Sequence, residues 1–118
     1  MWNRPNKYSA KKETRIIDGK PVVFASKKEA ERWDELRILA RAGKIHDLRR
    51  QQRFVLIPAQ RRDGKLLEQP CVYVADFTYT ATETGEKVVE DVKGMLTPVY
   101  KIKRKLMLYV HGIQVREV

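Results

Sequence analysis

The chain has 118 residues and a mass of 13.9 kDa, the usual size of one domain, which excludes two catalytic domains. With 42% hydrophobic and 34% charged residues, it is too apolar to be disordered throughout and long enough to bury a core. Lys and Arg number 25 against 15 Asp and Glu, so the net charge is +10. Such an excess concentrates polyanions at the surface, and nucleic acid is the expected partner.

The cysteine content and the hydropathy of the sequence indicate the cellular compartment of the protein. Cys71 is the single cysteine, so no internal disulfide is possible, and no Cys/His cluster offers a zinc site. The first residues contain no apolar stretch typical of a signal peptide, and no apolar run is long enough to span a membrane. We expect an intracellular protein without a structural metal or a membrane segment.

The first residues form a basic segment that precedes the domain. Residues 1–14 are rich in cations, including Lys11 and Lys12, and lack apolar periodicity, which predicts a mobile arm. We place one domain at residues 15–118. It begins with a small hairpin, because β-favouring residues at 15–17 and 21–24 flank the turn sequence at 18–20.

A strong helix is predicted to begin at Ser26 and continue through Ala42. Ser26 and Glu29 match a capping box, and Gly43 stands where a C-terminal cap belongs. At 100° per residue, Glu29 heads the stripe that also contains Trp33 and Leu36. Glu31 and Glu35 fall on other faces, so they are weaker candidates for a buried role.

Three strands follow. Residues 45–57 predict an extended strand with a basic first half, which ends before Pro58, and residues 61–65 form a turn. Residues 71–79 and 87–93 predict two antiparallel strands, joined through the turn at 83–85.

A second helix begins at Thr97 and Pro98 and runs to about Val110, before the break at 111–112. Its predicted apolar face consists of Val99, Ile102, Leu106, Tyr109 and Val110. Residues 113–118 alternate like a final strand. The element order after the first hairpin is therefore α-β-β-β-α-β, which predicts an α/β fold with a mixed central sheet flanked by helices.

Acidic residues on two neighbouring strands form the chemical signal of this sequence. Side chains alternate along a strand, so Asp91 and Lys93 share a face with Val89, while Glu90 points to the other. Asp76, on the preceding strand, can lie beside Asp91. Two adjacent carboxylates repel unless a cation lies between them, and hard oxygen ligands suit Mg²⁺ or Mn²⁺.

Nearby residues can complete this site. Lys93 can orient an attacking water or offset charge on a phosphate in the transition state. Glu29, on the inward face of its helix, can supply a third carboxylate, directly or through water. The alternative for Glu29 is a purely structural role as the third residue of the capping box.

These residues resemble the PD-(D/E)xK nuclease superfamily, whose restriction-endonuclease-like core has the same αβββαβ order. The chain is similar to small phage and prophage proteins of that superfamily over nearly its whole length. The shared segments are Lys7-Tyr8-x-Ala10-Lys11-Lys12, Phe24-x-Ser26-Lys27-Lys28-Glu29-Ala30, Tyr73-x-Ala75-Asp76-Phe77 and Glu90-Asp91-Val92-Lys93-Gly94. The chain departs from the pattern in two places, since Ala75 replaces the usual Pro and Asp91 replaces Glu.

The resemblance implies metal-dependent DNA cleavage. Asp76, Asp91 and the Val92 carbonyl would be metal ligands, Lys93 would lie near the nucleophile, and Glu29 would be the acid on the helix. The products would be 5′-phosphate and 3′-hydroxyl ends.

The basic residues are expected to hold the DNA backbone, which fixes position rather than sequence. Gln51 and Gln52 are candidates for phosphate or water contact, or are simply exposed. The predicted DNA-binding residues are Lys101, Lys103, Arg104, Lys105, Arg49, Arg50, Arg53, Gln51, Lys11 and Lys12.

The sequence thus predicts a Mg²⁺- or Mn²⁺-dependent endodeoxyribonuclease without an organic cofactor. By analogy with the junction resolvases of the PD-(D/E)xK superfamily, the expected substrate is branched DNA such as a Holliday junction, during phage recombination or replication in the cytoplasm of a bacterial host. Symmetrical junction cutting needs two active sites and hence a homodimer. Two alternatives stay open: a non-catalytic DNA-binding protein on a nuclease fold, and an RNA-binding accessory domain, which leaves the carboxylates unexplained.

Overall fold

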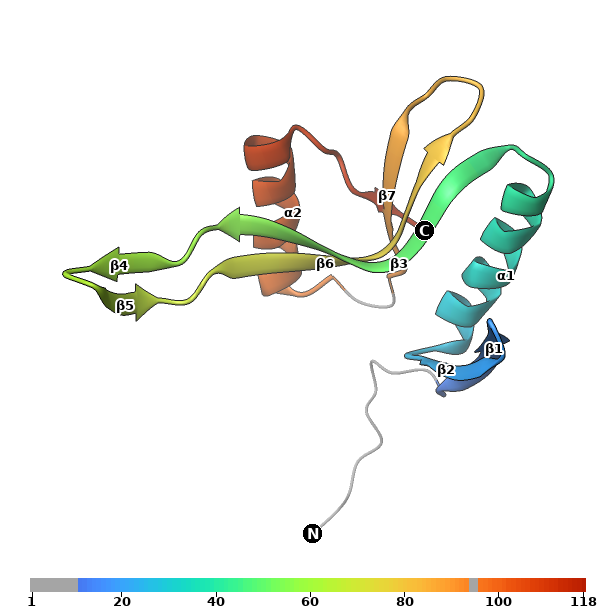
Figure 1. Cartoon of the computed structure of the whole chain (residues 1–118), viewed down its shortest axis with the longest axis horizontal. Coiled ribbons are helices and arrows are strands. Elements are labelled where there is room, and N and C mark those ends of the chain that lie inside the picture. The colour runs from blue at the N-terminus through green and yellow to red at the C-terminus, as the bar shows by residue number, and fades with distance from the viewer. Residues whose placement is uncertain (1–10, 94–95) are drawn as a thin grey trace, which may run out of the picture.

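The computed structural model describes residues 11–93 and 96–118, which form a mixed α/β arrangement with two helices (Figure 1). A four-stranded sheet has the order β3-β6-β7-β8, and two separate two-stranded hairpins are β1-β2 and β4-β5. In chain order the elements are β1 (Glu13–Ile17), β2 (Lys20–Phe24), α1 (Lys27–Arg41), β3 (Ile45–Ile57), β4 (Gln60–Arg62), β5 (Lys65–Glu68), β6 (Cys71–Ala81), β7 (Lys87–Asp91), α2 (Pro98–His111) and β8 (Arg116–Glu117).

The β1-β2 hairpin confirms the first predicted turn. Asp18 and Gly19 have φ of 51° and 78°, and such positive values suit Gly and Asp in two-residue hairpin turns. Regular structure begins at Glu13, slightly before the predicted domain start. The predicted basic arm lies mostly outside the described residues; its Lys11 and Lys12 are described and exposed.

α1 begins and ends as the sequence predicts. Ser26 is the N-cap, and its hydroxyl accepts a 3.0 Å hydrogen bond from the backbone N–H of Glu29. Trp33 and Leu36 are buried against one face of the sheet together with Phe77 of β6. The inward stripe is therefore confirmed, with Glu29 at its head and only 7% exposed.

The main sheet contains the predicted strands in the predicted order. β6 pairs antiparallel with both β3 and β7, and β8 pairs parallel with β7 after the α2 crossover. β7 ends at Asp91, two residues earlier than predicted, and β8 spans only two residues. The β4-β5 hairpin was not predicted, because its short polar strands carry no hydrophobic alternation that marks a half-buried strand.

Two buried clusters lie on the sheet, and β6 contributes to both. Tyr73 and Ala75 pack in the cluster that contains Met107 of α2, whereas Phe77 and Tyr79 pack in the cluster of α1. Asp76 therefore lies where β6 passes from one helix to the other. Opposite this point, Gln51 of β3 has φ of 52°, a left-handed conformation that interrupts the regular strand.

The predicted buried face of α2 is wrong. Val99, Ile102 and Tyr109 are 61%, 58% and 87% exposed, while the buried residues are Tyr100 and Met107, about 120° around the helix from the centre of the predicted stripe. Tyr100 and Met107 pack in the buried cluster on the sheet, and the Tyr100 hydroxyl also donates a 2.7 Å hydrogen bond to Glu117 of β8.

None of the described helices is long and apolar enough to cross a membrane.

Candidate functional site

Asp76, in the middle of β6, and Asp91, the last residue of β7, lie side by side. The register pairs Phe77 with Glu90, so one residue further along each strand Asp76 stands opposite Asp91. The backbone N–H of Val92 donates a 2.7 Å hydrogen bond to Asp76 Oδ2. The sequence expectation that the hairpin brings these two acids together agrees with this geometry.

Lys93 joins the pair. Its Nζ lies 2.7 Å from Asp91 Oδ1 and 3.6 Å from the centre of the Tyr100 ring. The other carboxylate oxygen of Asp91 accepts a 2.6 Å hydrogen bond from the Tyr73 hydroxyl. Asp91 is thus held from two sides, and the ammonium group of Lys93 is placed between a carboxylate and an aromatic face.

The electrostatics are those of crowded, buried acids. Burial raises the pKa of Asp76 to about 6; the Val92 hydrogen bond opposes this rise and the Glu29 carboxyl adds to it. Burial also raises the pKa of Asp91, against the hydrogen bonds from Lys93 and Tyr73. The same burial, together with the contact to Asp91, raises the pKa of Tyr73. Such a site favours a bound cation.

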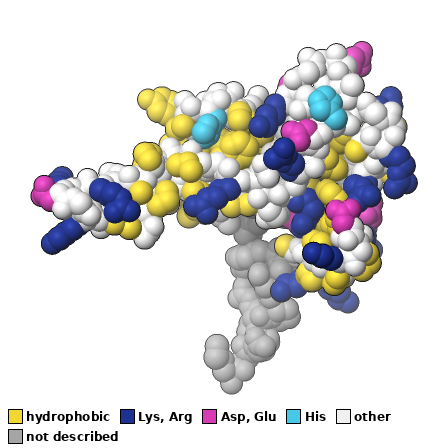
Figure 2. Space-filling view, viewed as in Figure 1, with side chains coloured by type: hydrophobic (Ala, Val, Ile, Leu, Met, Phe, Trp, Pro, Cys, Tyr) yellow, Lys and Arg dark blue, Asp and Glu magenta, His cyan; other side chains and the backbone are white. Residues whose placement is uncertain are grey.

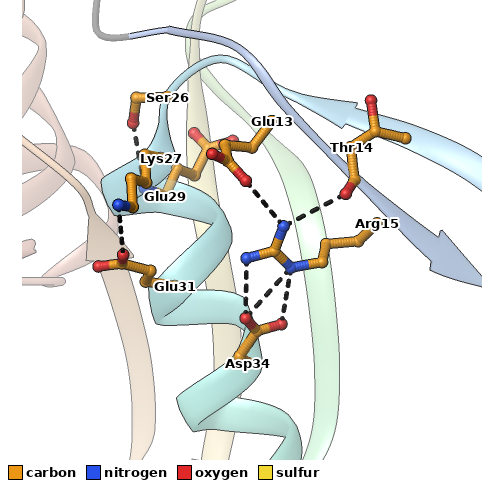
Figure 3. A network of polar contacts seen from close by, with 8 residues as sticks. All are labelled: Glu13, Thr14, Arg15, Ser26, Lys27, Glu29, Glu31 and Asp34. Atoms are coloured by element: carbon orange, nitrogen blue, oxygen red, sulfur yellow. Dashed lines mark hydrogen bonds and ion pairs between the residues drawn. The ribbon is translucent and has the colours of Figure 1, made fainter.

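Glu29 reaches this site from the first turn of α1. Its backbone N–H serves the Ser26 cap (Figure 3), while its side chain acts on the pKa of Asp76. The contact to the Ser26 cap uses the backbone of Glu29, so its carboxylate stays available for a role beside Asp76. Glu31 and Glu35 form ion pairs with Lys27 and Arg32 and are largely exposed.

Arg15 fixes α1 to the β1-β2 hairpin, as Figure 3 shows. Its guanidinium donates hydrogen bonds of 3.0–3.1 Å to the carboxylate of Asp34 on α1, and one of 3.0 Å to Glu13 on β1. These contacts raise the pKa of Arg15. They support the helix that presents Glu29.

A buried ion pair holds β7 next to the site. Glu90 is fully buried and accepts hydrogen bonds of 2.8 and 2.6 Å from Arg32 of α1, and a third from the Tyr79 hydroxyl. Glu90 thus points away from Asp91, as the alternation of the strand requires. Lys28 of α1 donates a 3.1 Å hydrogen bond to the carbonyl of Lys93, a second tie between α1 and this chain segment.

Sequence reasoning missed Tyr73, Tyr100, Arg32 and Lys28. The position of Tyr73 three residues before Asp76 gives no local signal, because its hydroxyl reaches Asp91 on the next strand. Tyr100 packs in the buried cluster of α2 and also contacts Lys93 through its ring, which no local pattern indicates. Lys28 lies within the capping motif of α1 and Arg32 shortly after it, but no local feature of the sequence indicated that they contact Lys93 and Glu90.

The carboxylates fit a magnesium-type ion loosely. Within residues 11–93 and 96–118, no three His, Cys, Asp or Glu side chains are grouped as a preformed metal site. Mg²⁺, however, is typically bound by one or two carboxylates and keeps several waters. The Asp76–Asp91 pair and its crowded acids meet that smaller requirement.

The predicted DNA-binding residues differ in their surroundings. Arg50 is half-buried, with its guanidinium 4.3 Å from the Phe24 ring centre and its Nε without a hydrogen-bond partner, so it packs on the core. Arg104 is half-buried and paired with Glu117 at 2.8 Å. Lys103 is half-buried. The exposed members are Lys101, Lys105, Arg49, Arg53, Gln51, Lys11 and Lys12.

A polar pocket of about 170 Å³ lies along the sheet from Asp76. Thr78, two residues after Asp76 on β6, lines it with Arg49 and Gln52 of β3 and Lys87 of β7. Two of the sequence candidates, Arg49 and Gln52, therefore line one pocket, which neither Asp76 nor Asp91 lines.

A family model described as "Protein of unknown function (DUF1064)" matches residues 5–117. The chain belongs to this family. No curated protein and no solved structure matches it.

Proposed function

We propose that this protein is a divalent-metal-dependent endodeoxyribonuclease. The observation that carries the proposal is the placement of Asp76 and Asp91 on adjacent strands, opposite each other where the β6-β7 ladder ends, with Lys93 Nζ 2.7 Å from Asp91. An acid pair with an adjacent ammonium group, in a chain of net charge +10, suits hydrolysis of a phosphodiester in a polyanion.

The residues have separate roles in this proposal. Asp76, Asp91 and the Val92 carbonyl would hold Mg²⁺ or Mn²⁺, with Glu29 contributing directly or through water. When bound, such an ion supplies charge neutralisation at the phosphate and lowers the pKa of the attacking water. Lys93 orients that water or donates to the phosphate oxygens. Tyr73 and Tyr100 fix the positions of Asp91 and Lys93.

The fold assignment belongs to the same proposal. The order α1, β3, β6, β7, α2, β8 agrees with the αβββαβ order of the restriction-endonuclease-like core. The two acids then stand on the second and third core strands, where the PD-(D/E)xK resemblance places them. The fold assignment and the metal-dependent chemistry are therefore proposed together.

The proposed substrate is branched DNA, such as a Holliday junction, in phage recombination or replication within a bacterial host. Symmetrical cutting of a four-way junction requires a homodimer. Basic residues of β3 and α2 would hold backbone phosphates near the scissile bond. This part of the proposal rests on the resemblance to junction resolvases.

A panel of end-labelled DNA structures tests the proposal. Four-way junctions, flaps and duplexes are incubated with the protein in Mg²⁺, Mn²⁺ or chelator. We expect nicking in the divalent ions, none in chelator, and at least a hundredfold loss in Lys93→Ala. The control is Lys44→Ala, an exposed residue in the loop after α1. Nicking by Lys93→Ala at the rate of the control contradicts the proposal.

A second candidate is a non-catalytic DNA-binding protein on the same fold. It is favoured by the absence, within the described residues, of a three-ligand metal group. It requires DNA binding with a steep salt dependence and no nicking in either metal ion.

A further inference from the structure

The β4-β5 hairpin projects from the body of the molecule. It continues the paired strands β3 and β6 beyond α2 and ends in a tight turn at Asp63 and Gly64 (Figure 1). All residues of both strands are exposed. Neither buried cluster of the described chain contains a residue from it. The hairpin therefore adds nothing to the hydrophobic core, and its role must lie in what it contacts.

The end of the hairpin carries closely spaced cations. Arg62 and Lys65 are direct cross-strand partners beside the turn, and Arg61 precedes them. Like charges placed directly opposite each other on a sheet destabilise it. Asp63 offsets only part of this charge. Figure 2 shows basic side chains gathered along this end of the molecule. The repulsion is relieved when a polyanion lies against the turn.

The projection can reach as far as one helical repeat of duplex DNA from Asp76. From Asp76 the chain runs back along β6 and β5 to Lys65, eleven residues away, which is at most about 36 Å at 3.3 Å per residue. One turn of B-form DNA is about 34–36 Å. Arg53, exposed on β3 between the two points, continues the basic track. A duplex entering the site can thus meet the hairpin about one helical turn away.

A second copy of the chain fits the hairpin less well than DNA does. The open strand edges and the half-exposed Leu66 and Leu67 would permit pairing with another hairpin. An identical hairpin, however, brings its own Arg62 and Lys65 into the same region of a chain with net charge +10. Charge complementarity favours the phosphate backbone.

We propose that the β4-β5 hairpin is a DNA-contacting arm, in which Arg61, Arg62 and Lys65 bind backbone phosphates about one helical turn from the site of Asp76 and Asp91. The inference deepens the proposed function and rests on it for the position of the scissile bond. It predicts that DNA must extend about ten base pairs to one side of the cut for full affinity.

The test compares two variants of equal charge change. The arm variant is Arg61→Ser/Arg62→Ser/Lys65→Ser, and the control is Lys20→Ser/Arg41→Ser/Lys44→Ser, at exposed positions on β2, α1 and the loop after it. Binding to a hairpin-capped 6-base-pair duplex and to a 40-base-pair duplex is measured by fluorescence anisotropy in chelator, so that cleavage plays no part. Circular dichroism melting checks that both variants fold.

We expect the arm variant to bind the 40-base-pair duplex at least tenfold more weakly than the control, with a salt slope lower by about 2–3. On the 6-base-pair duplex, which is too short to reach from the site to the arm, the two variants should agree within about threefold. Equal binding of both variants to the long duplex overturns the proposal. So does loss of a wild-type dimer in the arm variant alone, measured by sedimentation equilibrium, which would assign the hairpin to subunit contact.

The same variants separate this proposal from that of nuclease activity. If wild type cuts DNA and the arm variant binds like the control, the arm assignment fails and the nuclease stands. If wild type binds without cutting and the arm variant loses affinity, the arm assignment stands and the nuclease fails. Absence of DNA binding by wild type overturns both.

Discussion

The backbone N–H of Val92 donates a hydrogen bond of 2.7 Å to the carboxylate of Asp76. Through this contact the residue after Asp91 is fixed to the neighbouring strand, beyond the last pair of the β6-β7 ladder. The two acids therefore cannot move apart without breaking it. When no metal ion is bound, ionisation of the two crowded carboxylates should lower the stability of the folded protein.

Replacing Asp76 with Asn should stabilise the metal-free protein at neutral pH. The pKa of Asp76 is raised to about 6 in the folded state, so its contribution to stability is present below about pH 4 and lost as the pH rises through 6. Asn carries no charge and can still accept the Val92 hydrogen bond. At pH 7.5 in chelator we expect a gain of about 1–2 kcal/mol in urea unfolding. The gain of Asp76→Asn over wild type should disappear at pH 4. An equal gain at both pH values would contradict a raised pKa of Asp76.

The two roles of Glu29 can be separated by two substitutions. Ser26→Ala removes the cap of α1 and should cost about 1 kcal/mol of stability, with cleavage by the folded protein unchanged. Glu29→Gln keeps the backbone cap and removes the charge beside Asp76, so cleavage should fall about tenfold or more while the helix persists. Chemical denaturation and nicking rates give the two readouts. A purely structural Glu29 would leave the nicking rate intact.

Tyr100 should affect cleavage through its ring rather than its hydroxyl. Tyr100→Phe keeps the aromatic face below Lys93, whereas Tyr100→Leu removes it. We expect kcat to fall about 5- to 30-fold in the Leu variant with little change in KM, and to stay within about threefold in the Phe variant. If both variants lose activity equally, the hydroxyl contact to Glu117 matters instead.

The Arg32–Glu90 pair should dominate the local stability of β7. Arg32→Met leaves the fully buried Glu90 without its cation and should cost about 3–5 kcal/mol in urea unfolding. Glu35→Gln removes the exposed partner of the same arginine and should cost under about 0.5 kcal/mol. A small effect of Arg32→Met would show that solvent reaches Glu90.

Local signals in the sequence were sufficient to predict the two helices and the strands of the main sheet. Ser26 and Gly43 mark the ends of α1, Thr97 and Pro98 mark the start of α2, and strand alternation separates Asp91 from Glu90. These features depend on neighbours a few residues away. The pairing of Asp76 with Asp91 follows equally from one short hairpin connection.

The rotation of α2 and the partners of the acids could not be predicted in this way. Helical periodicity favoured a face with Val99, Ile102 and Tyr109, but α2 buries Tyr100, which contacts Lys93 and Glu117. These contacts join residues far apart in the sequence. The same is true of Arg50, a cation expected on DNA, which packs against Phe24.

DNA nicking by Asp91→Asn tests the central claim most directly. The matched control is Asp18→Asn, an exposed turn residue whose left-handed φ of 51° Asn accepts readily. With labelled branched and duplex DNA in Mg²⁺ or Mn²⁺, we predict nicking by wild type and by the control. Asp91→Asn should bind DNA in chelator normally but cut it at least a thousandfold more slowly. Undiminished nicking by Asp91→Asn would contradict the assignment of this site.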